Sequence, residues 1–312
     1  PKTALLYSLA QLLGGLAAAY TAAVLCHKSP AIAPAPGFGV WQAGICELVY
    51  AFMLSIVVLS MPLAAGDGPN DFFGLAVGFV MLAGAYGAGP ISGGFFNPSV
   101  TIAMDVVGSA SGFGWCIAYV VFQLLGGMVA ALVFKVVRNE DFGGVRRGTV
   151  AELTSEFVGT FLLVLTFGLN VLAKSPSAAV SVGAALMCTT YALSGVSGAH
   201  LNPAVTLAVL VSGRSPRGVA QKTKGQACAC VGVQLLAGAL AALTYSAVYL
   251  GGSFRLGPGL RAASWDAPLA AELVFTALLC YVYLCTTLSE TTATAAFHGL
   301  AIGACVVVGS AA

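Results

Sequence analysis

Two near-identical loops place the strongest constraint on how this chain can fold. Residues 92–101 contain Asn97-Pro98-Ser99, residues 197–206 contain Asn202-Pro203-Ala204, and both loops lie between apolar segments. Asn is a favoured N-cap and Pro is favoured at the first helical position, so each Asn-Pro predicts the start of a short helix. The positive end of that helix dipole faces the loop. One copy would be an ordinary turn signal, whereas two half-helices inside a membrane bundle are typical of a selective pore.

The composition indicates a multi-pass integral membrane protein with the lipid bilayer as its surroundings. Of the 312 residues, 59% are hydrophobic and 8% are charged, whereas an average soluble domain carries about 25% charged residues. The net charge of +2 and the absence of a basic block argue against a nucleic-acid partner. The nine Cys are scattered, with no pattern that predicts a metal or redox site. We therefore expect no metal, no cofactor and no enzymatic activity.

The apolar segments predict eight full-length spans, because about 20 residues cross the hydrocarbon core. A ninth span, at 294–312, is incomplete or just complete, and the half-helices are expected at 97–107 and 202–211. The eight spans are expected at 3–25, 40–61, 72–91, 112–137, 151–173, 178–196, 227–250 and 268–288.

Three sequence features recur in a fixed order and indicate an internal repeat of about 110 residues. They are a Glu near the start of a helix, an Asn-Pro loop, and a Gln-Leu-Leu helix. Three spans per unit give successive units opposite orientations, which is the inverted-repeat plan of many membrane carriers and channels. The Glu residues are Glu47, Glu156 and Glu272, and the Gln residues are Gln11, Gln123 and Gln234. The repeat divides the chain into the end of one unit at 1–25, two complete units at 40–137 and 150–250, and the start of another at 266–312.

These motifs resemble the aquaporin, or major intrinsic protein, family over nearly the whole chain. Besides the two loops, the resemblance rests on Glu-Phe-Val-Gly-Thr-Phe at 156–161 and Gln-Leu-Leu-Gly-Gly at 123–127. Residues 197–206 are close to the first Asn-Pro-Ala loop of the family, and residues 89–98 resemble the second. The resemblance implies an all-α membrane protein, an inverted-repeat helical bundle with two Asn-Pro half-helices. It also implies a homo-oligomer, usually a tetramer.

The order of the units is unusual, because the second-half-like unit precedes the first-half-like one. A tandem duplication and a circular permutation both account for this order. In either case the two complete units have opposite orientations and are able to pair. We therefore expect the half-helices at Asn97 and Asn202 to meet tip to tip and to leave a solvent path between them.

A pore between two Asn-Pro half-helices is expected to conduct water along backbone carbonyls and amide donors. Loop carbonyls accept hydrogen bonds from passing water, and the amides of Asn97 and Asn202 donate to its oxygen. Two half-helix N-termini repel cations, and fixed donors interrupt a proton wire. The simpler alternative for each Asn is that it only caps a helix, which contributes about 1 kcal/mol.

Buried ionisable and polar residues have structural and functional interpretations. Glu47, Glu156 and Glu272 lie inside spans, where a carboxylate is costly and usually has a partner. We favour acceptance of loop N–H groups, which would hold the loops in shape, over a proton-relay role, and the resemblance supports this. Gln123 and Gln234 are expected to support the loops in a similar way. His200 either lines the mouth of the pore or packs within its loop.

One departure from the family bears on selectivity. The second loop of the family usually carries an Arg just after its Asn-Pro-Ala, and here that position is Val100. The other constriction positions, carried over by spacing, fall on Gly94, Ala85 and Val182. These small apolar residues predict a wide, weakly polar filter that passes glycerol or urea at least as readily as water. The prediction depends on units 40–137 and 150–250 sharing one pore.

Two other classes remain open at this point. A secondary transporter or ion channel on another inverted-repeat plan would show a dependence of flux on membrane potential. A non-conducting membrane scaffold or a degenerate fragment of a family member is the other class, since the Arg is missing from the filter and both ends of the sequence are expected to be cut from a longer chain.

Overall fold

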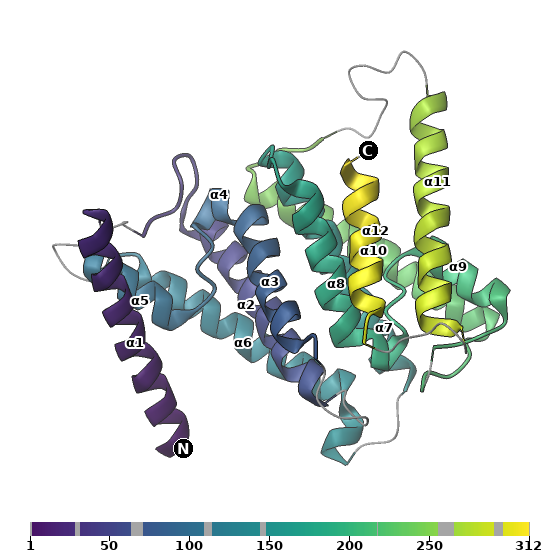
Figure 1. The fold of residues 1–312 in the computed structure, drawn as a ribbon, viewed down its shortest axis with the longest axis horizontal. Coiled ribbons are helices and arrows are strands. Elements are labelled where there is room, and N and C mark those ends of the chain that lie inside the picture. Colours follow the sequence, from purple (N-terminus) through teal and green to yellow (C-terminus); the bar gives the residue numbers. More distant parts are fainter. Residues whose placement is uncertain are drawn as a thin grey trace.

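The computed structural model describes residues 2–28, 32–63, 71–108, 114–143, 148–216, 218–254, 265–289 and 296–311. This part of the chain consists of helices joined by turns and loops, with no β-strand (Figure 1). Seven of its helices are long and apolar enough to cross a membrane. The prediction of an all-α, multi-pass membrane protein is confirmed.

The helices follow the expected order along the chain. The first half contains α1 (Lys2–Cys26), α2 (Val40–Leu63), α3 (Phe73–Gly87), α4 (Gly89–Ser92), α5 (Pro98–Gly108) and α6 (Cys116–Val137). A short 3₁₀ helix, η1 (Asn139–Phe142), leads to the second half. That half contains α7 (Thr149–Leu172), α8 (Ala178–Ser197), α9 (Pro203–Ser212), α10 (Lys224–Val248), α11 (Asp266–Tyr283), the π-helical turn η2 (Leu284–Leu288) and α12 (His298–Ala311).

The span expected at 72–91 is interrupted, so this part of the prediction is wrong. The structure has a 15-residue helix, α3, followed after Ala88 by the single turn α4. Pro90 lies at the start of α4, and it has no N–H to donate to the carbonyl of Tyr86. The helix therefore ends before Pro90, and a new turn begins there.

Both half-helices start at their prolines, as the motif predicts. α5 begins at Pro98 and α9 begins at Pro203. Asn202 has an extended backbone (φ −154°, ψ 129°), and its side chain accepts a hydrogen bond from the N–H of Ala204. This is the geometry of an N-cap followed by proline at the first helical position.

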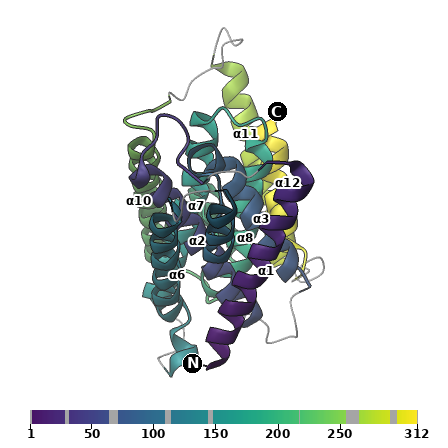
Figure 2. The ribbon, with the colours of Figure 1, turned by 90° about the vertical axis from the view of Figure 1, so that its left-hand side faces the viewer.

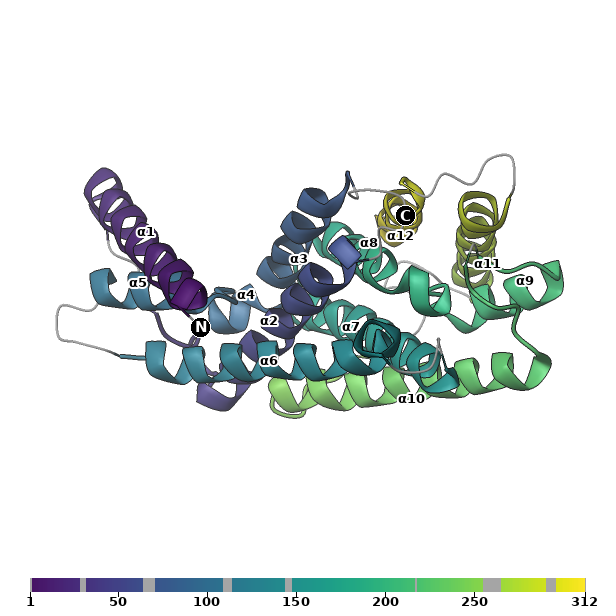
Figure 3. The ribbon, with the colours of Figure 1, turned by 90° about the horizontal axis from the view of Figure 1, so that it is seen from below.

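In Figure 3, α6 and α10 extend along the long axis of the molecule, whereas α11 and α12 are seen nearly end-on, and Figure 2 shows α1 leaning across the near end. The two halves of the chain meet where α2 and α3 pack against α7 and α8. We call this contact the seam. α8 lies between α3 and α12 (Figure 3), and most of its residues are buried.

Polar contacts reinforce the seam. Ser181 Oγ of α8 donates to the carbonyl of Ala83 in α3 at 2.9 Å, and the hydroxyls of Tyr50 and Thr166 lie 3.0 Å apart between α2 and α7. All four residues are buried. A buried polar group is costly unless it is paired, so these bonds specify one register between the two halves.

The half-helices lie at opposite ends of the molecule. In Figures 1 and 3, α5 lies beside α1 at one end of the long axis and α9 lies near α11 at the other, with the seam helices between them. α5 packs on α1 and α6, and α9 packs on α10 and α11. The expectation that Asn97 and Asn202 meet tip to tip is therefore wrong. The units pair through their α2–α3 and α7–α8 faces, which turns the half-helices away from each other.

Candidate functional site

The Asn97 loop is held by a buried carboxylate on α2. Glu47 is fully buried and accepts hydrogen bonds from Ser92 Oγ at 2.7 Å, from the N–H groups of Phe95 and Phe96 at 3.0 and 2.6 Å, and from Gln123 Nε2 at 2.7 Å. Gln123 Nε2 also donates to Thr101 Oγ1 at 2.8 Å. Four donors around one carboxylate satisfy a charge that would be costly in the membrane interior.

The Asn202 loop is built in the same way around Glu156 on α7. This carboxylate is also fully buried. It accepts from Ser197 Oγ at 2.6 Å, from the N–H groups of His200 and Leu201 at 3.0 and 2.8 Å, and from Gln234 Nε2 at 2.8 Å. Gln234 Nε2 also donates to the hydroxyl of Thr206 at 3.0 Å.

The backbones of the two loops match residue by residue. Gly93 and Gly198 both have φ of 92°, and Phe96 and Leu201 have φ of 52° and 50°. Positive φ is unfavourable for a side chain with a β-carbon. The carboxylate bonds to the same loops provide the contacts that hold Phe96 and Leu201 in this conformation.

The asparagine side chains use their amide oxygens to cap the half-helices. Asn97 Oδ1 accepts from the N–H of Ser99 at 2.9 Å, and Asn202 Oδ1 accepts from the N–H of Ala204 at 2.8 Å. Both residues are partly exposed, and among the described residues neither Nδ2 donates to a protein acceptor. Because each oxygen is engaged in capping, the two N–H donors of each Nδ2 are the polar groups of these side chains that remain available.

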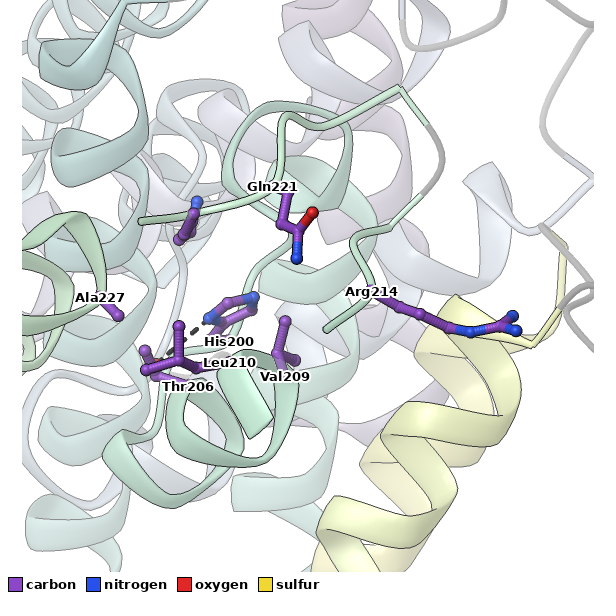
Figure 4. A pocket seen from close by; sticks show the side chains of 8 residues that line it. His200, Thr206, Val209, Leu210, Arg214, Gln221 and Ala227 are labelled. Carbon is purple, nitrogen blue, oxygen red and sulfur yellow. Dashed lines mark hydrogen bonds between the residues drawn. The ribbon is translucent and has the colours of Figure 1, made fainter. Parts of the chain in front are cut away.

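His200 is buried behind α9. It is 3% exposed, its Nδ1 lies 3.2 Å from Thr206 Oγ1, and its ring packs edge-on against Tyr283 with centroids 5.7 Å apart. Figure 4 shows its ring beside a cavity of about 10 Å³, with Gln221 reaching toward it and Arg214 pointing away. A cavity of this size holds about one water molecule. The role of His200 at a pore mouth stays a prediction.

The four proposed filter residues do not form one constriction. Gly94 and Ala85 are in contact, since a β-carbon on Gly94 would lie 3.5 Å from Ala85 Cα. Val100, on the first turn of α5, is 41% exposed. Val182 belongs to the other unit, on α8, and is 5% exposed. The prediction of a single four-residue filter is wrong, because it required a pore shared by the two units.

Glu272 differs from the two other repeated carboxylates. It lies on α11 and is exposed, whereas Glu47 and Glu156 are buried. Gln11 on α1 is exposed as well, whereas Gln123 and Gln234 are buried. Among the described residues no Asn-Pro loop reaches Glu272, and its role as a loop support stays a prediction.

Sequence reasoning missed several loop contacts. The hydroxyls of Ser92 and Ser197 each donate to the Glu carboxylate and accept from the N–H of the residue two positions after the Ser, Gly94 or Ala199. Both Ser residues stand at the start of the repeated loops, and this shared position could have indicated their role. Tyr119 and Tyr283 donate to the carbonyls of Ser92 and Gly198 at 3.0 and 2.6 Å. These tyrosines come from helices that do not correspond in the repeat, so no repeat pattern pointed to them.

Comparison with known proteins gives a family for this arrangement. The Major intrinsic protein family matches residues 62–173 and, separately, residues 148–312. The chain belongs to the major intrinsic protein family. The family matches this chain twice, which agrees with its two similarly built loops.

Individual relatives carry aquaporin names. Aquaporin-8 of Rattus norvegicus is 38% identical over 145 residues, which cover 42% of this chain and 53% of the relative. Aquaporin AqpM of Methanothermobacter marburgensis is 30% identical over 201 residues, covering 52% and 79%. Aquaporin NIP1-1 of Zea mays is 32% identical over 163 residues, covering 48% and 57%. The chain thus spans about half the length of aquaporin-8, and no solved structure matches it.

Proposed function

We propose that this chain forms parts of two separate passive channels for water and small neutral solutes. α2–α6 with α1 form part of one pore around Asn97. α7–α10 with α11 and α12 form part of a second pore around Asn202. The observation that carries the proposal is the matched pair of loops. In each loop a buried Glu accepts backbone N–H groups, and the Asn uses its amide oxygen to cap the half-helix, which leaves its N–H donors for a solute.

Two features of the half-helices support conduction of neutral solutes rather than ions. The N-terminus of each half-helix carries partial positive charge, which disfavours cations. The Nδ2 groups of Asn97 and Asn202 donate to an incoming oxygen, and orienting that oxygen interrupts a chain of proton-conducting hydrogen bonds.

The first pore is expected to pass solutes larger than water. Its constriction positions within this chain are Ala85, Gly94 and Val100, which bring no charge and little bulk. Glycerol and urea are therefore proposed as permeants together with water. The proposal applies to the Asn97 pore alone, since Val182 lies on the other side of the seam.

Flux through liposomes that contain the full-length protein tests the proposed function. Water, glycerol and urea permeabilities are expected to exceed those of protein-free liposomes and to be independent of membrane potential. Water flux without glycerol flux would refute the wide filter. Potential-dependent flux would favour a transporter or ion channel, and an absence of all flux would favour a scaffold.

A further inference from the structure

The connection between α9 and α10 crosses one end of the Asn202 loop. Its described residues, 213–216 and 218–223, are called the strap below. α9 has ten residues, so it is about 15 Å long and returns to the membrane side from which the loop entered. Pro216 of the strap is buried and packs on Gly198 at the start of the loop, since a β-carbon on Gly198 would lie 3.0 Å from Pro216 Cγ. The strap therefore covers this end of the loop.

A buried ion pair fixes the strap to α7. Lys222 Nζ lies 2.7 Å from Glu152 Oε2, and the two side chains are 6% and 11% exposed. Glu152 lies in the first turn of α7, where the helix N-terminus favours a carboxylate. Separating two buried charges is costly, because each is left without its partner. The pair therefore holds the strap in one position.

The corresponding connection in the first unit has a different anchor. Between α5 and α6, the carboxylate of Asp105 on the half-helix accepts the N–H groups of Gly114 and Cys116 at 2.7 and 3.2 Å. Counted from each half-helix asparagine, the equivalent residue of α9 is Leu210, whose side chain cannot accept a hydrogen bond. The second unit therefore fixes its connection to a neighbouring helix, α7, instead of to its own half-helix.

The fixed strap leaves room for about one water molecule at this end of the loop. The cavity of about 10 Å³ beside His200 is lined by Thr206 and Val209 of α9 and by Gln221 and Lys222 of the strap (Figure 4). His200 Nε2 is buried and has no hydrogen-bond partner among the described residues. A buried polar nitrogen of this kind is satisfied by water. The cavity therefore suits a single water, whereas glycerol, which is several times larger, does not fit.

We propose that Lys222 and Glu152 determine the size selectivity of the Asn202 pore, because they hold the strap over a passage that admits water and excludes glycerol. The inference rests on the proposed conduction around Asn202. Both residues act as positioning residues, since selectivity comes from the place of the strap and not from contact between the charges and the solute. Release of the strap widens this end of the pore and admits glycerol beside water.

Hydrogen exchange in the full-length protein, reconstituted in nanodiscs, tests whether the ion pair holds the strap. Lys222→Met keeps a long side chain but removes its charge and donors, and it is expected to raise amide exchange in peptides that cover the strap several-fold. Lys224→Met removes an exposed Lys two positions later and is the control, with no change expected. Unchanged exchange of residues 92–101 shows that the fold is intact. The double variant Glu152→Lys, Lys222→Glu reverses the pair and is expected to restore slow exchange.

Flux into liposomes tests the selectivity, in an Asn97→Asp background that leaves the Asn202 pore as the proposed route. The parent protein is expected to pass water but not glycerol. Lys222→Met is expected to raise glycerol flux several-fold, and the reversed pair is expected to lower it again. Lys224→Met is expected to behave as the parent protein.

Three results would overturn the inference. They are unchanged strap exchange in Lys222→Met, fast exchange in the reversed pair, and water flux that continues without any gain of glycerol flux when the strap is released. An absence of water flux in the parent protein would instead refute the proposed function. The exchange rates do not depend on conduction, so they would still decide whether the ion pair holds the strap.

Discussion

Ser181 donates a hydrogen bond of 2.9 Å to the carbonyl oxygen of Ala83, and this bond crosses the seam between the two units. Ser181 also accepts from Asn170 Nδ2 at 2.8 Å, so the contact belongs to a small buried network. Because the units join through this face, their half-helices point to opposite ends of the molecule. The proposal of two separate pores, in place of one pore between the units, rests on this arrangement.

The separation of the pores predicts additive effects on flux. Asn97→Asp and Asn202→Asp keep a good N-cap at each half-helix but replace the amide donors with a carboxylate. Since the two sites are far apart and independent, each substitution is expected to lower total water flux by about half, and the double variant to lower it to the protein-free level. Stopped-flow measurement of liposome swelling checks this. Complete loss of flux in either single variant would instead indicate one shared pore.

The filter of the first pore predicts a change in selectivity. Val100→Arg places a long cation on the exposed first turn of α5. It is expected to reduce glycerol flux through the Asn97 pore more than water flux. Both fluxes are measured in an Asn202→Asp background, in which the other proposed pore is blocked. Val100→Met adds length without charge and serves as the control. Equal reduction of both fluxes by the Arg variant would contradict the assignment of Val100 to the constriction.

The carboxylate network predicts a loss of stability when one acceptor is removed. In Glu47→Gln, an amide N–H₂ group replaces one carboxylate oxygen. This group is a donor and cannot accept the hydrogen bonds from the loop or from Gln123 that the oxygen accepted. An unsatisfied buried donor costs about 1–3 kcal/mol, so the thermal unfolding temperature in detergent is expected to fall. Glu272→Gln in a polypeptide of residues 1–312 is the matched control, because Glu272 is exposed there. Similar losses in both variants would show that burial of the network is not the cause.

Two adjacent glycines on α6 predict different effects of substitution by Ala on stability. A β-carbon at Gly126 would lie 2.3 Å from the Leu48 carbonyl oxygen, whereas one at Gly127 would lie 3.6 Å from Ser55 Oγ. Gly126→Ala must push α2 and α6 apart, at an expected cost of about 1–3 kcal/mol. Gly127→Ala makes an ordinary contact and is expected to change stability by less than about 0.5 kcal/mol. Thermal unfolding of both variants measures the difference, and equal stability of the two would contradict the close α2–α6 contact.

Local chemistry allowed much of the architecture to be predicted from residues alone. Long apolar segments with few charges specify membrane helices, because the bilayer interior requires every backbone group to be paired within its own segment. The half-helix starts at Pro98 and Pro203 follow from capping preferences that act over a few residues. Glu47 and Glu156 marked the positions that contact the loops, since a carboxylate in a span needs a partner, whereas the exposed Glu272 shows no such contact among the described residues.

The tertiary structure alone decided which surfaces meet. Opposite orientation of the two units makes a shared pore possible, but orientation does not specify the face through which helices pack. That choice depends on side-chain fit and polar pairing between distant segments, here Ser181 with Ala83 and Tyr50 with Thr166. These contacts place Asn97 and Asn202 at opposite ends of the molecule, and Ala85 and Val182 on different helices, α3 and α8. They also leave Glu272 exposed, although the sequence around it repeats that of the buried Glu47.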